Sequence, residues 1–107
     1  MGLFNHNEAE DAYNQVNGGE KPVDSITHEL LAGAAGFEAV RMYEKHREKE
    51  GITEHHELGK ELLAGFAGAA ADKFIEKGVY SHLDKERAKK ASQEQAEHLW
   101  QQREQGY

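Results

Sequence analysis

The chain has 107 residues, 20 of them acidic and 13 basic, so its formal net charge at pH 7 is −7. A chain of this length forms one domain with a modest core, and a net negative charge repels a phosphate backbone. The basic residues do not gather in one segment, so we expect no nucleic-acid partner.

The chain has no cysteine, which excludes disulfides, thiolate metal sites and thiol catalysis. The N-terminal stretch lacks the basic and apolar regions of a secretory signal. The longest apolar runs, LLAGAAGF and LLAGFAGAAA, are about half of the roughly 20 residues that span a bilayer. These features predict a soluble, cytoplasmic protein.

The first predicted element is a short helix over residues 8–16, ended by Asn17 and two glycines. The only proline, Pro22, falls in the loop that follows. Asp24 or Ser25 can cap the next helix, which we place at about 25–49.

Two further helices follow. Gly51 ends the helix at 25–49 and Thr53 caps the next one, at about 54–77, which Gly78 closes. Ser81, with Asp84 three residues later, starts a C-terminal helix at about 82–102. No alternating apolar pattern occurs, so the sequence predicts a single all-α domain over residues 1–107.

The two middle helices repeat one phrase, HELLAGAAGFEAVRMYEKH at 28–46 and KELLAGFAGAAADKFIEKG at 60–78. Ten of the nineteen aligned positions are identical, at an offset of 32 residues. If the chain folds back at Gly51, an antiparallel hairpin brings the small-residue centres together, with Gly36 opposite Ala67 and Ala35 opposite Gly68. We therefore predict a close helix-packing interface built from small residues of both repeats, namely Ala32, Gly33, Gly36, Ala64, Gly65 and Gly68.

The two repeats are apolar nearly all round, so something must cover the hairpin. One candidate is a second copy of the chain, which would give a homo-oligomeric helical bundle. The alternative is the N-terminal segment of the same chain, through Leu3, Phe4, Tyr13 and Val16. We favour the homo-oligomer because a small core gains from association.

The pairs Ala32 with Gly36 and Ala64 with Gly68 also fit the small-xxx-small pattern of membrane helices. Their acidic flanks and short apolar runs argue against a membrane surface as partner. Ordinary helix packing is the preferred interpretation.

Seven histidines, at positions 6, 28, 46, 55, 56, 82 and 98, raise the question of a metal. Neither His28-Glu29 nor His56-Glu57 continues as HExxH, and no histidine follows a glutamate by three residues. We therefore expect solvated histidines and no cofactor.

Catalytic motifs are missing from the sequence: it has no GxSxG, no Walker loop and no strand-linked GxGxxG. Asp72 stands where the first repeat has Val40, and a surface position explains it better than a buried acid. We expect no enzyme.

Four segments, MGLF, HELLAGAAGFEAVRMYEKH, ELLAGFAGAAADKFIEKG and LDKERAKKAS, together resemble the CipC-like family of filamentous fungi, named from a concanamycin-induced protein. The resemblance covers essentially the whole chain. It implies a small stress- or antibiotic-responsive protein with no catalytic residues to carry over.

Two functional classes follow. The first is a self-associating structural or interaction protein linked to stress response, in which Trp100 and Leu99 of the C-terminal helix could contact a partner. The second is a helical bundle that binds an apolar small molecule, haem or a metal ion. A tight glycine interface leaves little room for such a ligand, which favours the first class.

Overall fold

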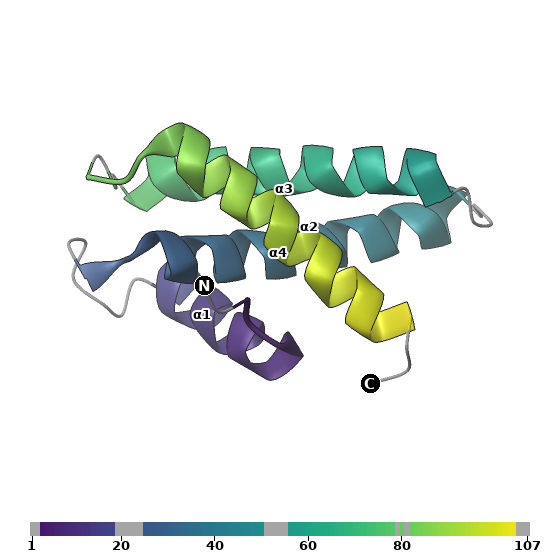
Figure 1. The fold of residues 1–107 in the computed structure, drawn as a ribbon, viewed down its shortest axis with the longest axis horizontal. Helices are drawn as coiled ribbons and strands as arrows, with labels where there is room; N and C mark the ends of the chain where they lie inside the picture. Colours follow the sequence, from purple (N-terminus) through teal and green to yellow (C-terminus); the bar gives the residue numbers. More distant parts are fainter. Residues whose placement is uncertain (1–2, 19–24, 51–55, 79, 81, 105–107) are drawn as a thin grey trace.

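The computed structural model describes residues 3–18, 25–50, 56–78, 80 and 82–104. They form four helices, α1 (His6–Gly18), α2 (His28–Glu50), α3 (His56–Gly78) and α4 (Lys85–Glu104). No strand occurs in these ranges, so the prediction of an all-α fold is confirmed. In Figure 1, α2 and α3 lie side by side in opposite directions and α4 crosses both, while α1 packs beside α2.

Side-chain caps explain where three of the helices begin. Asn5 and Glu8 form a reciprocal capping box at α1, with the Glu8 amide donating to Asn5 Oδ1 at 2.9 Å. Thr27 Oγ1 accepts from the Leu30 amide at 3.1 Å, so α2 is capped by Thr27 and the prediction of Ser25 is wrong. Asp84 Oδ1 accepts from the Arg87 amide at 3.1 Å and caps α4.

Several predicted boundary residues cannot be compared with the structure. Asp24, Gly51, Thr53 and Ser81 lie outside the described residues. The C-terminal helix begins at Lys85, directly after the Asp84 cap, rather than at about 82.

Helix α2 forms the centre of the molecule. Every residue from Leu31 to Phe37 is buried, because α1, α3 and α4 each pack against a different part of its surface. This arrangement explains why the first repeat is apolar nearly all round: it is a helix covered on several sides. Helix α1 and α4 of the same chain supply much of that cover.

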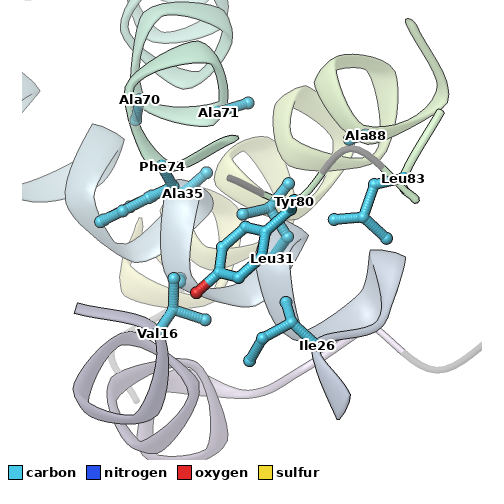
Figure 2. Packing of buried hydrophobic residues seen from close by; sticks show 11 residues of the cluster. Val16, Ile26, Leu31, Ala35, Ala70, Ala71, Phe74, Tyr80, Leu83 and Ala88 are labelled. Atoms are coloured by element: carbon cyan, nitrogen blue, oxygen red, sulfur yellow. The ribbon is translucent and has the colours of Figure 1, made fainter. Parts of the chain in front are cut away.

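Tyr80 lies at the end of the core that is drawn in Figure 2. Its ring packs among Val16, Leu31, Phe74 and Leu83, so that residues from α1, α2, α3 and the segment before α4 meet around one side chain. Only 5% of Tyr80 is exposed, and this burial raises the pKa of its phenol above the usual 10.0.

Two hydrogen bonds join the start of α2 and the residues just before it to the segment before α4. His82 Nε2 lies 2.9 Å from the carbonyl oxygen of Ile26, and the Asp84 amide donates to His28 Nε2, also at 2.9 Å. Both histidines therefore help to hold the two helix starts together.

The four repeat glycines do not face one another, so the predicted contacts of Gly36 and Gly68 between the repeats are wrong. Small residues of α2 and α3 nevertheless share one buried cluster, which contains Ala34, Ala35, Ala70 and Ala71. A Cβ at Gly33 would lie 2.8 Å from Phe4 Cε2, so Gly33 faces the N-terminal segment and α1. A Cβ at Gly36 would lie 2.7 Å from Gln95 Cγ, so Gly36 faces α4. Gly68 also faces α4 at ordinary contact distance, and a Cβ at Gly65 would meet nothing within 4 Å.

Candidate functional site

The site of interest is an uncovered apolar face on α3, formed by Leu62, Gly65, Phe66 and Ala69. The spacing i, i+3, i+4, i+7 places these four residues on one stripe of the helix. Gly65 and Ala69 are exposed, whereas Leu62 and Phe66 are half-buried on its α2 side. There the Phe66 ring lies 6.0 Å from the ring of His46. We call these four residues the α3 face.

The other side of the α3 face is bordered by α4. Gln93 Nε2 donates to the carbonyl oxygen of Ala64 at 3.2 Å, and the same side chain approaches Gly68. Ala64 and its counterpart in the first repeat, Ala32, were both predicted to lie in the helix-packing interface. Ala64 is half-buried beside α4, whereas Ala32 in α2 is only 5% exposed. The α3 face is therefore the ridge between the α2 contact and the α4 contact.

The first repeat carries the same face, and there it is covered. Gly33 and Phe37 correspond to Gly65 and Ala69, and both are buried beneath α1. The Tyr13 ring of α1 packs against Phe37 with ring centroids 5.3 Å apart. Helix α1 packs against α2 but barely touches α3. The same surface is thus used in one repeat and left open in the other.

Opposite charges flank the α3 face along the helix. Glu61 precedes it and Lys73 follows it, and both side chains are exposed. Lys73 Nζ lies 3.6 Å from Glu38 Oε2 of α2, where the Glu38 side chain is only 16% exposed. An acidic end and a basic end therefore border an apolar centre.

Asp72 lies on the α4 side of this helix. Its carboxylate is 3.8 Å from Lys85 Nζ and 3.5 Å from Lys89 Nζ, and its side chain is 34% exposed. The expectation of a surface position thus matches a half-exposed acid that ties α3 to the start of α4.

Gln95 is the residue that sequence reasoning missed. It is 2% exposed, and its side-chain amide holds the backbone of Phe4, which places α1 on the first repeat. A usable signal exists in the sequence, because Gln95 falls on the apolar stripe of α4 with Ala88, Ala96 and Leu99. A buried amide on such a stripe requires hydrogen-bond partners.

The predicted partner contact at Leu99 is wrong, because Leu99 is 1% exposed and lies in the core of the single chain. Trp100 is half-buried, and its ring packs edge-to-face on Tyr43 at 4.8 Å between centroids. The Arg47 guanidinium lies 5.3 Å from the Trp100 ring centroid. This aromatic contact belongs to the packing of α4 on α2.

Within the described residues, two clefts open beside α4. One, of about 260 Å³, lies between α2 and α4 beneath Leu3, the exposed large apolar residue of the N-terminal segment. Its other lining residues are His28, Glu29, Ala32, Arg87, Lys90, Ala91, Glu94 and Gln95. The second, of about 280 Å³, lies between α3 and α4 with Lys60, Lys90 and Glu97 on its rim.

Neither a group of metal ligands nor a membrane-spanning helix occurs in the part of the chain that the structure describes. Within it, no three side chains of histidine, aspartate or glutamate come close enough together to hold a metal ion. No helix within those ranges combines the length and the apolar character needed to cross a bilayer.

The structure thus defines a small all-α protein in which four helices of one chain enclose the core and one helix leaves an apolar face open. Residues 12–103 match the family described as "Virulence factor CipC-like", and the chain belongs to that family. The family resemblance noted from the sequence is therefore confirmed. No curated protein and no solved structure matches the chain.

Proposed function

We propose that this protein is a small self-associating structural or interaction protein that works through the α3 face and catalyses no reaction. The observation that carries the proposal is the difference between the two repeats. The same apolar surface is buried beneath α1 on α2 and stays open on α3. An apolar surface that a helix covers elsewhere in the same molecule is suited to receive another helix.

The absence of catalysis in this proposal rests on the sequence, which lacks nucleophile and phosphate-binding motifs. The link to stress response rests on the family resemblance alone. A homo-oligomeric bundle, built by chains that share their α3 surfaces, is the assembly that we propose.

The test is the molar mass of the native chain in sedimentation velocity over a range of micromolar concentrations. Ala69→Glu places a charge on the α3 face and should return the protein to the monomer. Asn14→Glu adds the same charge at an exposed position of α1 and should leave the mass unchanged. A wild-type chain that stays monomeric at every concentration would contradict the proposed self-association.

A second candidate function is the binding of an apolar small molecule, haem or a metal ion, and the cleft beneath Leu3 supports its small-molecule form. Its volume of about 260 Å³ is just below the roughly 300–1,000 Å³ of common ligand pockets. Titration with anilinonaphthalene sulfonate and with haemin tests this candidate. The candidate is supported if the wild type binds a probe and Ala91→Trp, which fills the cleft, does not. If the wild type binds neither probe, these probes are excluded as models of the ligand.

A further inference from the structure

We infer that the partner of the α3 face is the same face of a second copy, packed antiparallel about a two-fold axis level with Ala67. This inference rests on the proposed function and adds the partner and its orientation. The observations that support it are the apolar α3 face and the charged residues at its two ends, Glu61 and Lys73.

The order of residues along the ridge is self-complementary. Glu61, Gly65, Ala69 and Lys73 are all exposed and follow one another at four-residue spacing, so they form a continuous ridge that winds about 120° around α3. Glu61 and Lys73 stand twelve residues apart, about 18 Å along the helix, with Ala67 midway. A two-fold axis at that level places Glu61 opposite Lys73 of the partner subunit, and Gly65 opposite Ala69 of the partner subunit.

The centre of the ridge suits close contact between two helices. A Cβ at Gly65 would meet nothing within 4 Å in the single chain, and Ala69 is the smallest side chain that could lie opposite it. Small residues at a helix crossing let the axes approach to the lower end of the usual range of roughly 8–10 Å or below it. The α3 face itself contains no charged residue that this contact would bury.

The flanks of the ridge fit the same axis. A two-fold axis perpendicular to both helices keeps the α2 side of one copy beside the α2 side of the other. Phe66, which is half-buried on that side, therefore lies against its own counterpart, whereas the two Leu62 side chains stand about 15 Å apart along the helices. Phe66 is one residue from the axis, so its ring covers the centre of the interface.

Lys73 already lies 3.6 Å from Glu38 within the chain. Its side chain is 59% exposed, so it can keep Glu38 on one side and meet Glu61 of the partner subunit on the other. Parallel packing of two α3 helices would instead place like charges together at each end, which is destabilising. The charges therefore select the antiparallel arrangement.

The test mixes two charge-reversed variants, Glu61→Lys and Lys73→Glu. Each variant alone brings like charges together at both ends of the interface, so each should sediment as a monomer. An equimolar mixture restores opposite charges at both ends and should return to the dimer. The control mixture, Glu86→Lys with Lys90→Glu, changes exposed charges on α4, and each of these variants should dimerise alone.

A cross-linking experiment tests the same antiparallel contact without altering the charges. This matters because Lys73→Glu also removes the ion pair with Glu38 within the chain. The chain has no cysteine, so Gly65→Cys and Ala69→Cys each carry one thiol. Mild oxidation should cross-link the two variants when they are mixed and neither when it is alone, because only the mixed thiols face each other. Circular dichroism of every variant verifies its helical content.

The outcomes separate this inference from the proposed function. Restoration of the dimer in the charge mixture, together with cross-linking only in the cysteine mixture, supports the antiparallel contact. A wild type that self-associates while neither mixture behaves in this way overturns the contact and leaves self-association standing. A monomeric wild type overturns both, and capture of the chain by a different protein through the α3 face overturns the second copy as the partner.

Discussion

The side-chain amide of Gln95 hydrogen-bonds both backbone polar groups of Phe4. The Phe4 amide donates to Gln95 Oε1, and Gln95 Nε2 donates to the Phe4 carbonyl oxygen, each at 2.8 Å. The two residues stand 91 positions apart in the chain. Glycines of α2 make room for both, since Gly33 lies against the Phe4 ring and Gly36 against the Gln95 side chain.

Gln95→Leu should weaken the hold on the N-terminal segment. Leucine is similar in size, but it leaves the Phe4 amide and carbonyl without this partner in a part-buried place. The expected loss of stability is about 1–3 kcal/mol by denaturant unfolding. Hydrogen exchange of α1 amides should accelerate more than that of α3 amides. Gln101→Leu, on the exposed side of α4, should change neither quantity.

Gly36→Ala should destabilise the fold. A Cβ there would lie 2.7 Å from Gln95 Cγ and 3.1 Å from the Ala96 backbone nitrogen, and the backbone of α4 cannot move aside alone. Overpacking of this kind costs about 1–3 kcal/mol. The measurement is the shift in melting temperature.

Gly65→Ala is the matched control for Gly36→Ala, because it occupies the equivalent type of helical site with open space around it. At concentrations low enough to give monomers, it should raise stability by about 0.5–1 kcal/mol through helix propensity. Equal effects of the two alanine substitutions would contradict the assignment of Gly36 to the α2–α4 contact.

Tyr80→Phe should lose less stability at alkaline pH than the wild type does. Burial raises the pKa of the Tyr80 phenol, so the unfolded chain loses this proton at a lower pH than the folded protein does. The wild type should therefore lose stability as the pH rises above 10.0, the ordinary pKa of tyrosine. Denaturant unfolding at neutral and alkaline pH measures the difference. Wild-type and Tyr80→Phe slopes that coincide would contradict the effect of burial.

Asp84→Ala should shorten or fray the start of α4. The variant removes the acceptor of the Arg87 amide, a loss that costs about 0.5–2 kcal/mol at an N-cap. Asp11→Ala, in the middle of α1, removes a carboxylate that accepts only an exposed hydrogen bond from Gln15 Nε2 among the hydrogen bonds described, and it should cost less. Urea unfolding curves of the two variants provide the comparison.

The helices were predictable from the sequence because glycine, capping residues and apolar periodicity act locally. The neighbours that each glycine faces were not predictable, because identical segments of the two repeats pack against different parts of the chain. Gly33 meets Phe4, whereas Gly65 has open space beside it. Those neighbours come from segments outside the repeat. The contact of Gln95 with Phe4 depends on the docking of α1, which no local pattern specifies. For the same reason the predicted pairing of Gly36 with Ala67 is wrong, although the prediction of helices is correct.

The bond between Phe4 and Gln95 also orders events during synthesis. Phe4 is synthesised before Gln95, and the amide that satisfies its backbone is made 91 residues later. Helix α1 must therefore wait, incompletely fastened, until α4 has been translated.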